Sequence, residues 1–191
     1  SNSKETEAQY EQASRLYQLL SGGNPKKIPL QQFILGIMLD DILTYANEFF
    51  SLLSRGRYSL RRLEGSAGGN AKSGLDLEVL DGFTGAPRSI ETLSGGEQFL
   101  ASLSLAFGLS DVVQSYSGSV RLDSIFIDEG FGSLDQDTLD TAMKALSQIQ
   151  KMGRTVGIIS HVSELKNRIA TQVQVHPSKN GGSSITMIKD A

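Results

Sequence analysis

The sequence predicts an α/β fold in which two parallel central strands are flanked by helices. Two short apolar runs of β-forming residues, at 124–127 and 155–159, are typical of central strands that are covered on both faces. Between them, Asp135 caps a helix with one apolar face, and Gly153 lies beyond its end. A strand, a helix and a strand with short links form a βαβ unit, which requires parallel strands and a right-handed crossover.

The composition is that of a globular protein. The chain has 191 residues, of which 39% are hydrophobic and 20% charged, enough for one domain or for one lobe of a larger protein. Its net charge of −3 gives no global basic signature for nucleic-acid binding. The sequence has no cysteine and no apolar run long enough for a membrane span, which favours a cytoplasmic protein. The chain starts without methionine, which suggests a fragment.

The N-terminal stretch at 4–20 is polar and helix-prone. Its apolar residues have the three-four-three spacing of a coiled-coil seam, and the same spacing also suits a short amphipathic helix on the surface of a globule. The spaced residues are Tyr10, Ala13, Tyr17 and Leu20. A Gly/Asn/Pro cluster at 21–25 then ends this helix.

A second, longer helix is predicted at 30–53, after Pro29 and before Gly56. Five residues at helical spacing share one face, which predicts that this helix lies mostly in the core. They are Phe33, Ile37, Asp41, Tyr45 and Phe49.

Two strands follow at 58–63 and 75–80. The glycine-rich stretch 65–74 between them superficially resembles a phosphate loop. It holds Ser66 and Ala71 where that loop needs glycine, and a strand follows it instead of a helix, so we expect a hairpin connection. Residues 86–92 then lead to the next helix.

The turn at 93–98, here called the signature turn, has an unusual helix start. Ser94 and Glu97 form a capping box, but Gly95 and Gly96 in the first turn each cost about 1 kcal/mol relative to alanine. Glycines at a helix N-terminus leave N–H groups open to an anion, so we expect contact with a nucleotide phosphate. The alternative is a serine-capped helix with incidental glycines.

The helix that begins at the signature turn, 95–114, is apolar nearly all round and is expected to be buried on several sides. After the βαβ unit, a short helix from Ser163 and a terminal hairpin with strands at 172–176 and 184–188 complete the chain.

Ionisable residues follow both buried strands, and ligands bind at the carboxyl ends of such strands. Asp128 and Glu129 end the first strand and suit a division of labour, with Asp128 holding Mg²⁺ and Glu129 deprotonating the attacking water. His161 ends the second strand and could contact a phosphate or hold the water. The alternatives are solvated carboxylates and a core histidine, and His176 is interpreted as structural.

Four motifs together resemble those of ABC-type ATPases. The signature turn is similar to their signature motif, 125–129 to their Walker B strand, Ser133-Leu134-Asp135 to their D-loop, and Ser160-His161 to their switch histidine. Within this superfamily, the amino-acid sequence of 128–135 resembles that of the SbcC-type family of SMC-like DNA-repair ATPases.

This resemblance implies the C-terminal lobe of an ABC/SMC-like P-loop ATPase head, because no Walker A loop or Q-loop precedes the signature. Residues 1–23 would be the end of a coiled-coil arm, and residues 24–191 the lobe. The N-terminal lobe of the same protein would carry the missing motifs, so the fragment alone is expected to be inactive.

The resemblance also implies roles for the motif residues. Ser94, Gly95, Gly96 and Glu97 would contact ATP held by a second head of the homodimer. Asp128 would bind the metal, while Glu129 and His161 would serve catalysis in their own head. The D-loop would be formed by Ser133, Leu134 and Asp135.

The implied function is ATP-dependent head dimerisation that gates DNA access to an SbcD-type nuclease subunit during double-strand-break processing. One alternative is the ATPase subunit of a membrane transporter. Another is a non-catalytic lobe that binds DNA or a protein partner through basic residues, although a solvated charged face is the simpler interpretation. These residues are Lys26, Lys27, Arg55, Arg57, Arg61 and Arg62.

Overall fold

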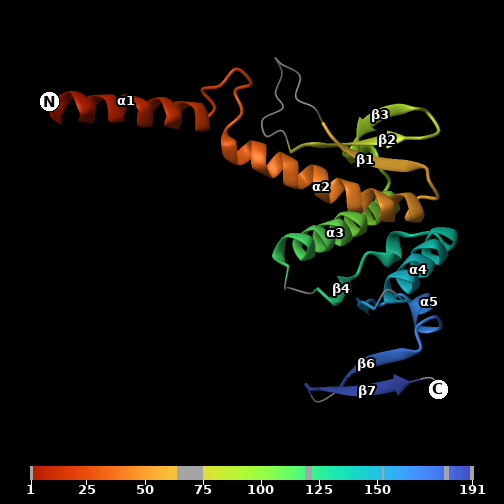
Figure 1. Ribbon diagram of the computed structural model, residues 1–191. Coiled ribbons are helices and arrows are strands. Elements are labelled where there is room, and N and C mark those ends of the chain that lie inside the picture. The colour runs from red at the N-terminus through yellow and green to blue at the C-terminus, as the bar shows by residue number, and fades with distance from the viewer. Residues whose placement is uncertain (1, 64–74, 119–121, 152, 179–180, 190–191) are drawn as a thin grey trace.

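The computed structural model describes residues 2–63, 75–118, 122–151, 153–178 and 181–189. The helix predicted at the N-terminal stretch is present as α1 (Asn2–Leu20), which extends away from the rest of the molecule, and α2 (Leu30–Leu53) leads back to the core (Figure 1). None of the helices in these ranges has both the length and the apolar character that a membrane-spanning segment requires.

The core forms where α2 packs along α3 (Gly95–Ser117). The two backbones approach closely at Gly108, where an added Cβ would lie 2.5 Å from the carbonyl oxygen of Ile42 and 2.9 Å from the Cβ of Ala46. Helix α3 is buried on several sides, as predicted. Its C-cap, Gly118, has a φ of 58°, a left-handed conformation that glycine adopts without strain.

The prediction that α2 lies mostly in the core is wrong. Phe33 and Ile37 are 54% and 46% exposed, and burial is concentrated in the C-terminal half of the helix. The residues of α2 that face α3 differ from the predicted ones. Ala46 lies in this contact, against Gly108 of α3. The buried residues of α2 are Gly36, Leu43, Ala46, Phe50 and Leu53.

An antiparallel sheet, in the order β1-β2-β3, packs beside α2. Its strands are β1 (Tyr58–Arg62), β2 (Leu77–Asp81) and β3 (Ala86–Ser89). The pairing of β1 with β2 agrees with the predicted hairpin, although the connecting stretch 65–74 lies outside the described residues. Sequence reasoning missed β3, which contains Pro87 and is an edge strand, where proline is tolerated.

The βαβ unit is confirmed, since β4 (Ser124–Asp128) and β5 (Thr155–Ile159) pair in parallel. The helix between them is α4 (Gln136–Lys151), whose apolar face is buried as expected. The prediction that both faces of these strands are covered is wrong. Phe126 is 74% exposed, and its ring lies over Gly157 of the neighbouring strand, on the face that α4 does not cover.

The chain ends in a short helix and a two-stranded ribbon, as predicted. Helix α5 (Ser163–Lys166) precedes β6 (Thr171–Pro177), which pairs with β7 (Ser183–Lys189) at one end of the molecule (Figure 1). One face of the ribbon carries four exposed apolar side chains, which lie opposite one another in pairs. They are Val173 with Met187 and Val175 with Ile185.

The close contact at Gly108 predicts a cost for any side chain there. Gly108→Ala should lower the free energy of unfolding by about 1–3 kcal/mol, because the added methyl group forces α2 and α3 apart. Gly95→Ala is the matched control on the same helix, because its added Cβ would meet no atom within 4 Å. Urea unfolding of both variants measures the difference, and equal stability of the two would contradict this packing argument.

Candidate functional site

The signature turn forms the capping box that the sequence predicts. The Oγ of Ser94 accepts from the backbone N–H of Glu97 at 3.4 Å, and the backbone N–H of Ser94 donates to Oε2 of Glu97 at 2.8 Å. A short 3₁₀ helix, η1 (Ile90–Thr92), leads into the turn, and Leu93 is buried beneath it. The helix start is therefore held from inside, while Ser94 itself is exposed.

The two glycines of this turn have different surroundings. An added Cβ at Gly95 would meet open space. At Gly96 it would lie 3.2 Å from the carbonyl oxygen of Ser133 and 3.3 Å from Cδ2 of Leu134. A ligand can therefore approach Gly95, as predicted. At Gly96 the absence of a side chain also allows close packing against Ser133 and Leu134. Helix geometry leaves the N–H groups of both glycines without acceptors inside α3.

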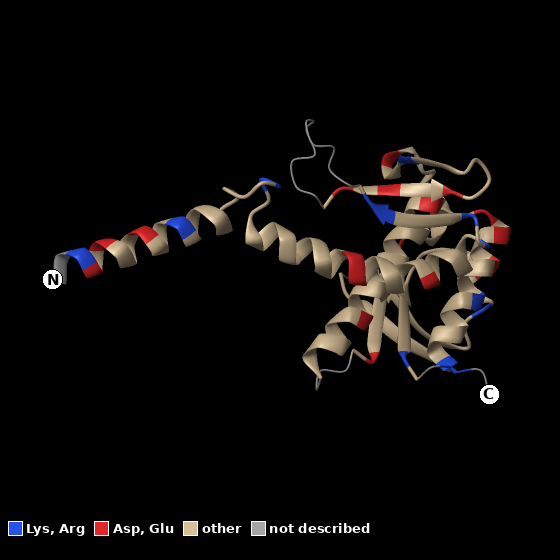
Figure 2. Cartoon of the chain, turned by 45° about the horizontal axis from the view of Figure 1, so that its top comes forward, with Lys and Arg blue, Asp and Glu red and all other residues tan. Residues whose placement is uncertain are grey.

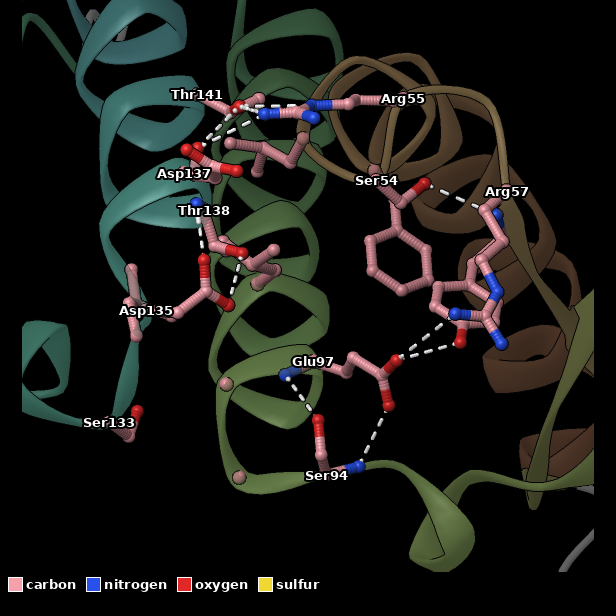
Figure 3. Close-up of a pocket in the computed structure, with 17 residues that line it drawn as sticks. Ser54, Arg55, Arg57, Ser94, Glu97, Ser133, Asp135, Asp137, Thr138 and Thr141 are labelled. Carbon is pink, nitrogen blue, oxygen red and sulfur yellow. Dashed lines mark hydrogen bonds and ion pairs between the residues drawn. The ribbon is translucent and has the colours of Figure 1, made fainter.

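A pocket of about 440 Å³ lies between the signature turn, the end of α2 and the D-loop segment. Figure 3 shows Ser133 and Asp135 on one side of the start of α3, and the Glu97 side chain directed away from them, toward Arg57. The D-loop segment consists of the 3₁₀ helix η2 (Phe131–Ser133) followed by Leu134 and Asp135.

Asp135 caps α4, as the sequence predicts. One of its oxygens accepts from the N–H of Thr138 at 2.9 Å and the other from the Thr138 hydroxyl at 2.8 Å. These bonds hold the pKa of Asp135 below its usual value, the backbone bond having the larger effect. The carboxylate therefore stays charged at the edge of the pocket.

Glu129 and His161 meet at the carboxyl ends of β4 and β5. Nδ1 of His161 lies 2.9 Å from Oε2 of Glu129, and the N–H of Glu129 donates to the carbonyl of Ile159 at 2.9 Å. Glu129 has a φ of 59°, an uncommon conformation for a residue other than glycine, which often marks a functional position. His161 is 82% exposed, so it is not a core histidine.

The next residue, Gly130, cannot be replaced without moving an aromatic ring. Its φ is 94°, and an added Cβ would lie 2.1 Å from the ring of Phe99. That ring meets Phe131 edge to face, with centroids 5.0 Å apart. The contact ties the residues after β4 to the first turns of α3 and so fixes where the D-loop segment begins.

Asp128, the predicted metal ligand, ends β4 with an exposed side chain. Within the described part of the chain, no three His, Cys, Asp or Glu side chains lie together as a metal site built from protein alone would need. Mg²⁺ usually takes one or two carboxylates and completes its shell with water and substrate phosphates. A single aspartate at this strand end fits that pattern.

Sequence reasoning missed a polar network behind the signature turn. Oε1 of Glu97 accepts from the Tyr58 hydroxyl at 2.7 Å and lies 3.8 Å from Nη1 of Arg57. Arg57 also makes two hydrogen bonds, of 3.3 and 3.0 Å, to the buried carboxylate of Asp81. The local pattern gave no signal for these contacts, because they join β1, β2 and α3.

The network shifts the pKa of all four of its members, and the hydrogen bond with Asp81 raises that of Arg57. The hydrogen bonds from Arg57 lower the pKa of Asp81. Burial by itself would raise the pKa of Glu97, but hydrogen bonds from Tyr58 and Ser94 bring it below its usual value. Burial, followed by the bond to Glu97, raises the pKa of Tyr58 to about 12. Both carboxylates are therefore charged and the phenol is protonated at neutral pH.

Most of the basic residues considered for DNA binding are paired within the chain. Arg62 binds Asp40 at 2.7 Å, Arg61 lies 3.6 Å from Glu78, and Arg55 donates to Thr141. Figure 2 shows acidic segments interspersed with the basic ones, including along α1. The charges of Arg61 and Arg62 are therefore balanced within the chain, whereas Arg55 bonds, among the described residues, only to neutral groups.

The lowered pKa values predict a loss of stability in acid. Near pH 4 the unfolded chain binds more protons than the folded chain, because the pKa values of Asp81 and Glu97 are lower in the folded state. The stabilisation from these two carboxylates is complete above about pH 5 and is lost as the pH falls through their folded-state pKa values. The stability difference between the wild type and Asp81→Asn should therefore shrink from about pH 5 to about pH 3 in urea unfolding.

The exposed Asp76 provides the control, and Asp76→Asn should change stability by no more than about 0.5 kcal/mol. A difference for Asp81→Asn that stays constant with pH would contradict the assigned role of the Asp81 carboxylate.

The chain is similar to one family and to several curated proteins. A family model described as SbcC/RAD50-like, Walker B motif, matches residues 73–148. The SbcC subunit of nuclease SbcCD from Vibrio cholerae is 51% identical over 175 residues, which are 92% of this chain and 17% of that protein. The corresponding protein of Staphylococcus aureus is 49% identical over 84% of this chain and 16% of its own length. The chain thus spans about a sixth of these relatives.

Solved structures show the same fold at low sequence identity. The SMC head domain from Thermotoga maritima has a TM-score of 0.55 and 19% identity, covering 84% of this chain and 52% of that one. A structure from work on ATP-driven dimerisation and DNA-stimulated activation of SMC ATPases has a TM-score of 0.60 and 18% identity, covering 83% and 89%. Over most of its length this chain is therefore similar to SbcC proteins, it matches the SbcC/RAD50-like Walker B model, and its fold is that of part of an SMC head domain.

Proposed function

We propose that this chain is the C-terminal lobe of an ATP-hydrolysing head, with residues 1–23 as the end of a coiled-coil arm and 24–191 as the lobe proper. The observation that carries this proposal is the meeting of Glu129 and His161 at the carboxyl ends of two parallel strands. Their side chains are exposed, as residues that act on a bound nucleotide must be, and Asp128 directly precedes Glu129 in the chain.

Glu129 is the general base in this proposal. Its carboxylate accepts a proton from the attacking water, and His161 holds the carboxylate through Nδ1. A neutral imidazole that donates through Nδ1 has a lone pair at Nε2, so it can accept from the water, whereas a protonated imidazole can donate to a phosphate oxygen. Asp128 would hold Mg²⁺, which supplies charge stabilisation for the phosphate oxygens when bound.

The signature turn serves the ATP of a second head. Gly95 faces open space and its N–H lies at the positive end of α3, which suits a phosphate. The turn shares a pocket with Ser133 and Asp135, and that pocket is not lined by Glu129 or His161. This separation supports two half-sites on one lobe, one for the ATP of its own head and one for the ATP of the partner.

The N-terminal lobe of the same protein covers the open face of the β4–β5 pair. Phe126 and Ile159 are 74% and 56% exposed, and the ribbon of β6 and β7 adds four more apolar side chains. This chain matches only 52% of an SMC head domain, so the rest of a head is available to bury these surfaces.

The proposed setting is a cytoplasmic complex of two heads with an SbcD-type nuclease subunit and DNA. Relatives that carry the name of nuclease SbcCD support the presence of a nuclease partner. Association of two heads on ATP would control DNA access to that nuclease during double-strand-break processing. The exposed apolar residues of α1, such as Tyr10 and Tyr17, support pairing with a second helix of the arm.

Glu129→Gln tests the catalytic assignment in the reassembled head. ATP-dependent dimerisation should persist while hydrolysis falls by about 10²-fold or more, because the amide cannot accept the proton. Glu164→Gln, which changes an exposed glutamate of α5, is the matched control, and this chain without the rest of the head should show no turnover. Hydrolysis that survives the Glu129→Gln substitution would exclude Glu129 as the base.

Ser94→Arg tests the contact in trans. The long charged side chain should block ATP-dependent dimerisation, measured by sedimentation, while each head still binds ATP. Ser102→Arg introduces the same side chain at an exposed position further along α3 and should leave dimerisation intact. Normal dimerisation of the Ser94→Arg variant would contradict the assignment of the signature turn to the partner's nucleotide.

A further inference from the structure

We propose that Tyr58 is a positioning residue for the signature turn: its hydroxyl holds Glu97 and thereby fixes Ser94 and Gly95 for contact with the partner's nucleotide. The proposal rests on the trans contact argued above. It assigns a role in head association to β1, which carries none of the ATPase motifs.

The direction of the Tyr58 hydrogen bond follows from its two partners. Nη2 of Arg88 lies 3.1 Å from the Tyr58 oxygen, and a guanidinium can only donate. The single proton of the phenol is therefore directed to Oε1 of Glu97, at 2.7 Å. The raised pKa of Tyr58, about 12, keeps that proton in place across the physiological range.

Glu97 connects Tyr58 with the signature turn. Its second oxygen, Oε2, accepts the N–H of Ser94 at 2.8 Å, so both carboxylate oxygens are engaged. Rotation of the side chain would break a bond to a charged acceptor on each side, and such bonds are the stronger ones. The Ser94 hydroxyl and the N–H of Gly95 are thereby kept on the exposed side of the helix start.

Arg88, which donates to the Tyr58 hydroxyl, also holds the segment before the turn. Nη1 of Arg88 donates to both the carbonyl oxygen and the Oγ1 of Thr92, each at 3.1 Å. Since Nη2 of the same guanidinium binds Tyr58, the residues on both sides of Leu93 are tied to one phenol oxygen. Leu93 itself is buried, which leaves the turn little freedom.

The position of the phenol is set by the core. The Tyr58 ring stacks on Phe50 with centroids 5.9 Å apart, and its side chain is buried. On β2, Asp81 pairs with Tyr58 in the sheet register and holds Arg57, whose guanidinium lies 4.6 Å from the centre of the Tyr58 ring. Figure 3 shows Glu97 reaching from α3 toward this group. A buried sheet therefore serves as the fixed support for an exposed turn.

A preorganised turn lowers the cost of forming the contact in trans, and it does not act on the ATP bound in cis. Tyr58→Phe retains the ring and removes only the hydroxyl. In the assembled head, ATP-dependent dimerisation should weaken about tenfold, or ~1.4 kcal/mol, while the affinity of a single head for a fluorescent ATP analogue stays within about twofold. Sedimentation at graded head concentrations gives the first quantity, and fluorescence titration the second.

Tyr116→Phe is the matched control, because Tyr116 also donates to a carboxylate, Asp41, at 2.6 Å. It should leave both quantities unchanged. Glu97→Gln provides a second variant: its Oε1 still accepts from Tyr58, but its amide nitrogen cannot accept from Ser94. It should weaken dimerisation to a similar extent, and the Tyr58→Phe/Glu97→Gln double variant should lose less than the sum of the two.

The outcomes separate this inference from the proposed function. If Ser94→Arg blocks dimerisation but Tyr58→Phe does not weaken it, the positioning role is wrong and the trans contact stands. If Ser94→Arg has no effect, the trans contact itself is wrong. If Tyr58→Phe lowers the thermal midpoint of unfolding, and lowers single-head nucleotide affinity by the same factor as the dimerisation constant, Tyr58 is only structural and the inference is overturned.

Discussion

The contact between α2 and α3 at Gly108 sets the positions of the other elements near the candidate site. Glycine allows the two helix backbones to touch, so α3 lies deep in the molecule and its neighbours are packed around it. The first turn of α3 is thereby brought beside β1 and the D-loop segment. A change in this helix crossing would move the signature turn relative to both.

The residues of the candidate site lie in two places around this helix pair. One is the start of α3, where a capping box and the network behind it hold an exposed turn. The other is the carboxyl edge of the β4–β5 pair, where Glu129 is held in a left-handed conformation and bonded to His161. The aromatic contact of Phe99 with Phe131 joins the two places, because it links α3 to the residues that follow β4. This arrangement suits a protein in which a nucleotide is shared between two heads.

The exposed apolar surfaces have a common explanation. Phe126 on β4 and the four apolar side chains on one face of the terminal ribbon are exposed in this chain. The apolar run of β4 predicts a strand covered on both faces, which is what such a run implies for a complete sheet. This chain matches only 52% of an SMC head domain. In the head proposed above, the remaining part would cover the open face.

The sequence by itself determined the elements whose signals are local. Short apolar runs located β4 and β5, helical spacing located α4, and the serine–glutamate spacing gave the capping box. The motif residues of the candidate site were also named from the sequence alone. Only the tertiary structure decided which face of α2 is buried, why Gly96 is close to the D-loop, and that Tyr58, Arg88 and Asp81 support the signature turn. These are contacts between segments far apart in the chain, and their geometry depends on how whole helices and sheets pack, which no local pattern encodes.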